Sequence, residues 1–313
     1  MISQRPLTPA AFVLLVLICA VWGTNQTAIK IANEGFPPIL QAGLRSAASA
    51  LCLVVWCLVK GTPFFRLDRT LPWGLLAGLL FTGEFLALYV GLTLTDVSRG
   101  AIFIYVSPFV TAIGAHFLAP GERLDTSKLL GLLAAFAGVV LVFSDGLVAP
   151  KPGQIVGDLL CLTMGVLWGL DMINIKVTPL REVPSEQVLF YALAISAVLL
   201  TGASQLFGEP FEIVLAPRPL AAFAYTAIVV SFLSYVLFIW FIKHYPATFF
   251  GAFIFLSPIF GVATAALMLG EPVSVKLLAA LALTSLGIWL VNRPSTTARG
   301  AGRADTGRGT GEA

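Results

Sequence analysis

The sequence is dominated by apolar runs that are long enough to cross a lipid bilayer. An α-helix rises about 1.5 Å per residue, so about 20 apolar residues span roughly 30 Å of hydrocarbon. Ten such runs recur along the chain, at residues 10–31, 38–59, 72–92, 98–118, 128–144, 155–176, 187–206, 219–242, 247–269 and 275–292. The alternating pattern of membrane β-barrels is absent from them. The sequence therefore predicts an all-α membrane protein with ten transmembrane helices.

Composition agrees with a protein that lies in lipid. Of the 313 residues, 58% are hydrophobic and 11% are charged, against about 45–50% and about 25% in ordinary soluble domains. No small-residue cleavage site follows the first run, so we interpret it as an uncleaved helix rather than a signal peptide. The four cysteines lie inside apolar runs without C-x-x-C spacing. They predict buried side chains, with no metal site, no disulfide framework and no cofactor.

Charge placement predicts the orientation of the chain. An even number of spans puts both termini on one side. Of the 19 Lys and Arg residues, thirteen then fall on that side, five on the other, and Arg45 lies within a span. Cytoplasmic loops carry the excess of positive charge, which predicts a short cytoplasmic N-terminus at residues 1–9 and a cytoplasmic C-terminus. The Gly-, Thr- and Arg-rich residues 293–313 predict a disordered tail.

Two stretches in the second halves of the first and sixth runs are related. AVWGTNQTAIK at residues 20–30 aligns with VLWGLDMINIK at residues 166–176, which matches Trp22 with Trp168 and Lys30 with Lys176. Further along each half, Ser107 and Pro108 align with Ser257 and Pro258, and Gly121-Glu122 aligns with Gly270-Glu271. The chain therefore contains a duplication, with a first five-helix unit at residues 10–144 and a second at residues 155–292.

Because each unit holds an odd number of spans, the second unit enters the membrane in the opposite direction. Inverted repeats of this kind are typical of secondary transporters, whose sites lie between the repeats near the bilayer midplane. The order W-G-x-[N/D], then S-P, then a G-E turn in each half resembles the EamA-type permeases of the drug/metabolite transporter superfamily. The resemblance implies a carrier of the bacterial inner (plasma) membrane, often an exporter of amino acids or related compounds, with a central cavity between two inverted bundles.

Glu84 is the clearest candidate for a functional residue. It lies near the middle of the third run with apolar neighbours on both sides. A carboxylate at the bilayer centre costs about 2.5–3.5 kcal/mol on insertion scales, so we expect it to face the cavity and to couple transport to protons. A structural carboxylate paired with Arg45 or with a backbone donor is the alternative.

Polar and aromatic side chains in the duplicated helices are further candidates for the cavity wall. Asp171 occupies the repeat position of Asn25, and Gln26 follows Asn25 in the sequence. Hydrogen bonds between helices are the alternative explanation for these three polar residues inside apolar runs. Trp22, Trp168, Tyr89 and Tyr105 are predicted to line the cavity and stack on a substrate, with core packing as the alternative. Lys30 and Lys176 are interpreted as anchors at opposite membrane interfaces.

Pro108 and Pro258 are predicted to bend their helices. Proline removes one backbone donor and displaces the carbonyl four residues earlier, here that of Ile104 and that of Ile254. Ser107 and Ser257 lie beside these bends, and the two pairs are candidates for a gate or for bends that only shape the fold.

The sequence also restricts the class of function. It contains neither H-E-x-x-H nor a phosphate-binding G-x-x-x-x-G-K-[ST] loop, so we expect neither an enzyme nor an ATP-driven pump. The prediction is a secondary transporter that exports small metabolites by alternating access. A channel and a non-transporting receptor or scaffold are the alternatives. The expected partners are a small-molecule substrate, membrane lipid and protons, and no binding of nucleic acid is expected. The expected oligomeric state is a monomer or a homodimer.

Overall fold

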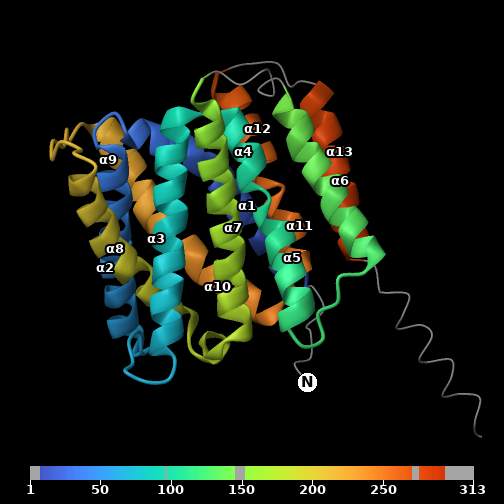
Figure 1. The fold of residues 1–313 in the computed structure, drawn as a ribbon, viewed down its shortest axis with the longest axis horizontal. Helices are drawn as coiled ribbons and strands as arrows, with labels where there is room; N and C mark the ends of the chain where they lie inside the picture. The colour runs from blue at the N-terminus through green and yellow to red at the C-terminus, as the bar shows by residue number, and fades with distance from the viewer. Residues whose placement is uncertain (1–7, 96, 145–151, 270–274, 293–313) are drawn as a thin grey trace, which may run out of the picture.

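The protein is helical throughout the residues that the computed structural model describes, which are 8–95, 97–144, 152–269 and 275–292 (Figure 1). The first half contains α1 (Pro9–Ala32), α2 (Pro38–Lys60), α3 (Leu71–Leu94), α4 (Val97–Ile104), α5 (Ser107–Leu118) and α6 (Thr126–Val142). The second contains α7 (Gln154–Val177), η2 (Pro179–Glu182), α8 (Ser185–Leu206), α9 (Pro217–Ala224), η3 (Tyr225–Ser234), α10 (Tyr235–His244), α11 (Ala247–Ile254), α12 (Ser257–Leu269) and α13 (Val275–Val291).

Six of these helical segments are long and apolar enough to cross a membrane. They are α1, α2, α3, α7, α8 and the continuous α9–η3–α10 segment at Pro217–His244. Shorter apolar helices lie at Ile102–Leu118, Thr126–Val142, Ala247–Ala263 and Leu278–Val291. The helical membrane architecture predicted from the apolar runs is therefore confirmed.

Two of the predicted spans are each divided into two helices, and both divisions fall at the S-P motifs. The run at 98–118 divides into α4 and α5, and the run at 247–269 divides into α11 and α12. Pro108 and Pro258 are each the second residue of the new helix, where proline needs no hydrogen-bond acceptor and its fixed φ suits the first turn. The backbone of Val106 and Phe255 at these divisions keeps helical dihedral angles, and the role of the two S-P pairs as gates stays a prediction.

Local sequence also fixes other helix ends. Thr8 caps α1 by accepting a hydrogen bond from the backbone N–H of Ala11 at 3.2 Å, and Asp125 caps α6 through Lys128 N–H at 2.9 Å. Such caps satisfy backbone donors that the helix itself leaves unpaired. Gly61 ends α2 with a φ of +66°, a left-handed conformation that costs glycine little.

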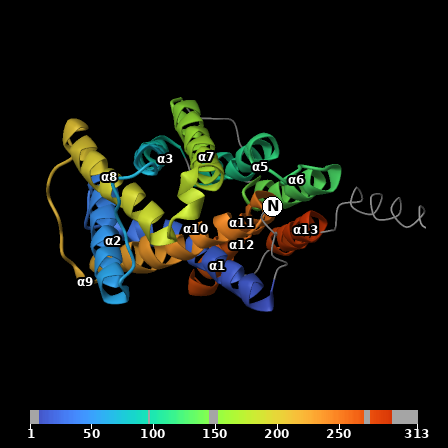
Figure 2. The same ribbon diagram turned by 90° about the horizontal axis from the view of Figure 1, so that it is seen from below.

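The helices form an elongated bundle (Figure 2), in which α2 packs with α8 at one end of the cross-section and α6 packs with α13 at the other. The contact between α6 and α13 depends on Gly131 and Gly287, because a Cβ on either would collide with the carbonyl oxygen of the other. Lipid gives helices no hydrophobic drive to associate, so this close packing is what stabilises the contact. Helices α1 and α7 lie between the two end pairs (Figure 2).

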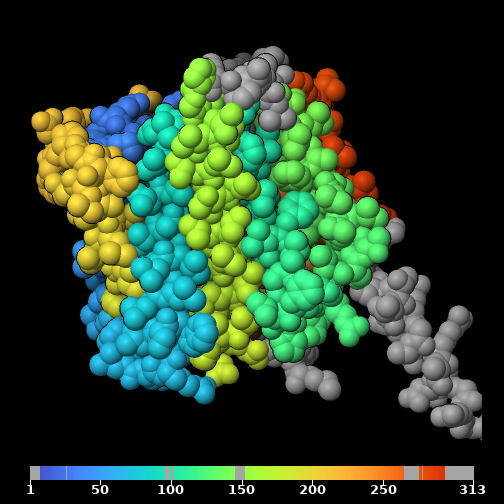
Figure 3. All heavy atoms as spheres, in the orientation of Figure 1, coloured from blue at the N-terminus to red at the C-terminus, as the bar shows by residue number. Residues whose placement is uncertain are grey.

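The bundle has two distinct ends. We call the end at which α1 begins the lower end and the end at which it finishes the upper end; α13 finishes at the lower end (Figure 1). In the space-filling view, α3, α7 and α5 form a continuous wall over one face (Figure 3). The outer side of α2 exposes Leu51, Val55 and Val59, at 68%, 60% and 83%, as expected for side chains that contact lipid.

Candidate functional site

The two repeat-related tryptophans meet near the centre of the protein. The rings of Trp22 on α1 and Trp168 on α7 have centroids 5.5 Å apart. Trp22 also packs on Tyr235 and Phe238, at 5.4 and 5.1 Å, and its indole N–H donates to Ser234 Oγ at 2.8 Å. Aromatic pairs at such spacings stabilise a contact beyond the area they bury. Trp22 and Trp168 therefore form an aromatic cluster that joins the two halves.

The W-G and S-P motifs pack against each other across the halves. A Cβ on Gly23 of α1 would collide with the carbonyl oxygen of Ser257, at the start of α12. In the repeat-related arrangement, a Cβ on Gly169 of α7 would press on the carbonyl oxygen of Ser107, at the start of α5. Each glycine thus lets its helix approach the interrupted helix of the other half, which gives both motifs a structural reason.

Three ionisable side chains are buried at successive depths beside the aromatic cluster. Arg45 lies near the upper start of α2, Glu84 near the middle of α3, and Asp171 toward the lower end of α7. Their exposed fractions are 1%, 0% and 7%. Asp171 and Arg45 are the charged groups whose fields act on Glu84. Helices α2 and α3 belong to the first half and α7 belongs to the second, and α3 packs along α7.

These buried groups are incompletely paired within the described part of the chain. No ion pair joins Arg45 to either acid there, and neither carboxylate oxygen of Glu84 has a hydrogen-bond partner. The Arg45 guanidinium instead lies over the ring of Phe85, with Cζ 4.1 Å from the centroid. An isolated charge in a low-dielectric interior is costly, so the arrangement suits groups that exchange partners.

Tyr89 connects this cluster to the upper end. It lies one turn beyond Phe85 on α3 and is 4% exposed, and its hydroxyl has no hydrogen-bond partner among the described residues. It lines a pocket of about 80 Å³ together with Ile29 at the end of α1 and Pro38 at the start of α2. The pocket extends from the upper end of the helices toward Tyr89.

The structure gives fewer contacts for the other predicted site residues. Asn25 on α1 is partly buried, and its side-chain oxygen has no partner among the described atoms. Tyr105 lies between α4 and α5 with its ring 6.1 Å from that of Phe255, the repeat-related residue. Ser107 and Ser257 are buried at the helix interruptions. Gln26 belongs to α1, and its side chain lies outside the described residues.

Lys176 does not anchor the chain at an interface, contrary to the interpretation of its sequence. Its side chain is only 10% exposed, and Nζ pairs with Glu122 Oε1 at 2.6 Å. Nζ also donates to the carbonyl oxygens of Ile242 and Tyr245, at 3.0 and 2.5 Å. The other oxygen of Glu122 accepts from the backbone N–H of Ala247 at 2.9 Å. This cluster, which we call the lower lock, ties the α5–α6 connection of one half to α7, α10 and α11 of the other.

A second buried ion pair lies near the upper end. Asp158 at the start of α7 pairs with Arg99 of α4, with Nη2 to Oδ2 at 2.5 Å, and accepts from Thr95 Oγ1 at 2.6 Å. Sequence reasoning assigned no role to Glu122, Asp158 or Arg99. The repeated Gly121-Glu122 turn was the one available signal for the lower lock.

Comparison with known proteins identifies the family of the chain. The profile of the EamA-like transporter family matches residues 10–144 and 155–293. A relative from Bacillus subtilis named "Uncharacterized transporter YvbV" is 28% identical, over 96% of this chain and 96% of its own. A protein from Salmonella typhimurium named "Probable amino-acid metabolite efflux pump" is 26% identical, over 88% and 93%. The relative of that name from Escherichia coli is 24% identical, over 83% and 87%.

A solved crystal structure supports the same fold. It has a TM-score of 0.78 and 21% identity, covering 90% of this chain and 97% of the other. Apolar helices and bacterial transporter relatives together indicate a multi-pass inner-membrane protein. The resemblance noted from the W-G, S-P and G-E motifs is confirmed, and the chain belongs to the EamA-like transporter family.

Proposed function

We propose that this protein is a secondary transporter that exports small organic metabolites, such as amino acids or related compounds, by alternating access. The observation that carries the proposal is the group of buried, incompletely paired charges Arg45, Glu84 and Asp171 beside the Trp22 and Trp168 cluster. Ionisable residues inside a membrane protein mark substrate and proton pathways. The names of the Salmonella and Escherichia relatives support the substrate class and the direction.

In the proposed architecture, residues 10–144 and 155–292 form two inverted units that together make ten spans. The segments α4–α5 and α11–α12 each count as one interrupted span, as do α9–η3–α10. The lower end faces the cytoplasm, so both termini lie there. One copy of the chain contains both halves of the pathway, which makes a monomer sufficient for transport.

Glu84 is the proposed coupling residue. Its carboxylate lies between the levels of Arg45 and Asp171, and nothing in the described part of the chain holds either oxygen. Protonation would remove its attraction to Arg45 and its repulsion of Asp171, and would change the charge presented to a substrate. Release of the substrate and uptake of a proton would then take place at the same residue, Glu84.

The lower lock supports a closed lower end in this state. It joins the halves through the buried Lys176–Glu122 ion pair and the hydrogen bond from Ala247 N–H to Glu122, whereas the pocket beside Tyr89 extends from the upper end. In the proposed cycle the lock breaks when the site opens to the cytoplasm, and α5 then separates from α7.

The substrate class is tested by release of metabolites from cells that overproduce the protein. Amino acids and amines accumulate in the medium, and growth in toxic concentrations improves, only if the protein exports them. Each responding solute is then measured as uptake into inside-out vesicles. Absence of transport for every solute, together with tight binding of a protein partner, would favour a receptor and contradict the proposal.

Proton coupling is tested in the same vesicles with and without an imposed pH gradient. Glu84→Gln keeps the shape of the side chain but cannot ionise, so the gradient should no longer stimulate uptake. The matched control is Glu34→Gln, which alters an exposed carboxylate 3.6 Å from Arg218 and should leave stimulation unchanged. Equal stimulation of wild type and Glu84→Gln would reject the coupling role.

A further inference from the structure

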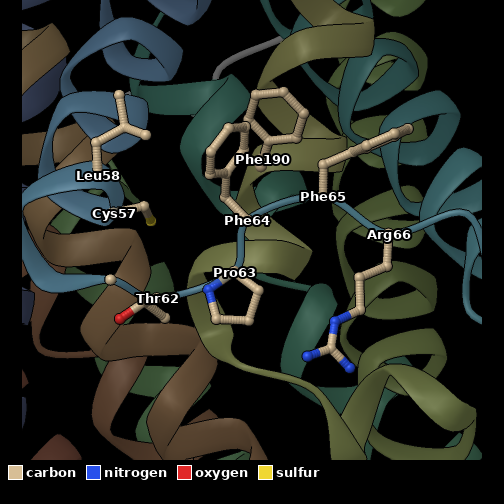
Figure 4. A pocket seen from close by; sticks show the side chains of 9 residues that line it. Cys57, Leu58, Thr62, Pro63, Phe64, Phe65, Arg66 and Phe190 are labelled. Atoms are coloured by element: carbon tan, nitrogen blue, oxygen red, sulfur yellow. The ribbon is translucent and has the colours of Figure 1, made fainter.

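A groove at the lower end lies outside the proposed transport pathway. It has a volume of about 790 Å³ and is formed by the C-terminal turn of α2, the loop that follows and α8. Figure 4 shows Cys57 and Leu58 on one side and Phe64 and Phe190 on the other, with Pro63 and Arg66 on the loop. None of these residues belongs to the aromatic cluster or to the lower lock, so the groove needs an explanation of its own.

The loop that forms the groove is fixed to α8 by a hydrogen-bond network. The Tyr191 hydroxyl donates to the carbonyl oxygen of Arg66 at 2.9 Å and accepts from its backbone N–H at 3.3 Å. Gln187 Nε2 donates to the Tyr191 hydroxyl at 3.0 Å and to Thr70 Oγ1 at 3.2 Å. Both backbone groups of Arg66 are thus engaged, which holds its Cα beside the groove.

The walls of the groove are apolar and continue the surface that contacts lipid. Phe190 packs edge to face on Phe64, with centroids 5.0 Å apart. Leu58 and Phe65 remain 69% and 46% exposed. Because α2 is a candidate span that ends at Lys60, the groove lies where its apolar outer side meets the interface. An apolar surface at this depth is suited to an acyl chain.

Arg66 is the one charged residue among those that line the groove, and Glu186 of α8 is the acid whose charge acts on Cys57 in its wall. Arg66 forms no ion pair within the described part of the chain, and Lys60 lies over the ring of Trp56, with Nζ 4.1 Å from the centroid. Arg69 is already paired with Glu182 at 2.7 Å. Lys60 also offsets the negative end of the α2 dipole. Arg66 is therefore the cation available to a ligand in the groove.

Asp68 is the acid nearest to Arg66 in the loop. Its carboxylate accepts hydrogen bonds from the hydroxyl and the backbone N–H of Thr70, at 2.6 and 2.8 Å. These hydrogen bonds lower the pKa of Asp68, and the charges of Arg66 and Arg69 lower it further by smaller amounts. Its oxygen is held toward Thr70, and no ion pair with Arg66 forms in the described structure.

We propose that the groove binds one anionic phospholipid of the adjoining leaflet, with an acyl chain against Leu58, Phe64 and Phe190 and the phosphate on Arg66. The guanidinium can donate two hydrogen bonds to one phosphate, and apolar and charged parts of the groove match the two parts of a lipid. The chain's own residues 293–313 are a poor occupant, because they carry four arginines and follow α13, across the molecule from this loop (Figure 2).

The test is native mass spectrometry of the full chain in detergent with added phosphatidylglycerol or phosphatidylcholine. We expect one retained phosphatidylglycerol, at least five-fold preferred over phosphatidylcholine, and a loss of that preference in Arg66→Ala. Arg66→Lys should retain part of it, and Arg69→Ala should retain all of it. Because the side chain of Arg66 does not support the loop, Arg66→Ala should also keep the wild-type melting temperature.

Three results would overturn the proposal. One is equal phosphatidylglycerol retention by wild type and Arg66→Ala. Another is displacement of the lipid by millimolar inorganic phosphate, which would identify a site for the free anion. The third is retention that appears only after residues 293–313 are removed, which would make the tail the occupant.

Discussion

Lys30 and Lys176 occupy the same position in the duplicated sequence and have opposite environments in the structure. Lys176 is buried and forms the lower lock with Glu122. Lys30 is exposed near the upper end, and no described residue forms an ion pair with it. The pocket of about 80 Å³ that extends toward Tyr89 lies at the end of Lys30, and a pocket of about 310 Å³ at the end of Lys176 is lined by Glu122 and Lys176 of the lower lock.

This difference shows that the same position of a repeat need not be equally buried in both halves; Glu271, the repeat counterpart of Glu122, lies outside the described residues. Inverted repeats can occupy two different conformations in one molecule, and exchange of those conformations is how such transporters alternate access. Under the proposed function, the contrast between the two lysines reflects the conformational state of the transporter and not a difference between the two residues.

The largest expected effect on stability comes from removing one partner of the ion pair in the lower lock. Lys176→Met leaves Glu122 buried without its partner, which should lower the free energy of unfolding by about 3–5 kcal/mol. Unfolding in mixed micelles with increasing denaturant measures the change. The Glu122→Gln, Lys176→Met double variant removes the uncompensated charge, so it should lose less than the single variant. An equal or greater loss would show that packing, and not charge, dominates the cluster.

An intermediate effect is expected at the glycines of the W-G motifs. In Gly23→Ala the new Cβ meets backbone atoms of Ser257 and Gly261, so overpacking should cost about 1–3 kcal/mol. In Gly169→Ala the new Cβ meets Val110 Cβ at 2.6 Å and one backbone atom, Ser107 O, at 3.0 Å, whereas in Gly23→Ala the Ser257 and Gly261 backbone atoms lie at 2.4 and 2.7 Å. A gain in helix propensity of roughly 1 kcal/mol offsets part of the strain in both variants. The same unfolding assay should rank Gly23→Ala as the more damaging. The reverse order would contradict this account of the contact.

The smallest effect is expected at Lys30. Its side chain is exposed and has no described ion pair, so Lys30→Met should change the free energy of unfolding by less than about 0.5 kcal/mol. This variant is the matched control for Lys176→Met, with the same substitution at the same repeat position. A loss as large as that of Lys176→Met would remove the contrast between the two ends.

The sequence was sufficient for the helical membrane fold and for part of the site. Apolar runs predicted the long helices, because a backbone that crosses lipid must satisfy its own hydrogen bonds, and a helix does so within one segment. The duplication also singled out Trp22 and Trp168, which do meet. The close contacts of Gly23 and Gly169 with the S-P motifs of the other half could not be predicted, because they join segments that are far apart in the sequence.

The paired charges could not be predicted in the same way. A lysine at the end of an apolar helix can extend to the interface or pair inside the protein, and the choice depends on what lies opposite. For Lys176 the partner is Glu122, distant in sequence and located in a connection between helices. Hydropathy and spacing within one helix carry no information about such a partner.

Alternating access at the two ends is tested most directly by thiol accessibility. In a chain whose four native cysteines are replaced by alanine, one cysteine is introduced at Leu88, which lines the upper pocket, or at Thr111, which lies between α5 and α7. We predict that Lys176→Met speeds modification of Thr111→Cys from the lower end several-fold and slows that of Leu88→Cys from the upper end. Faster modification at both positions, or no change at either, would contradict alternating access.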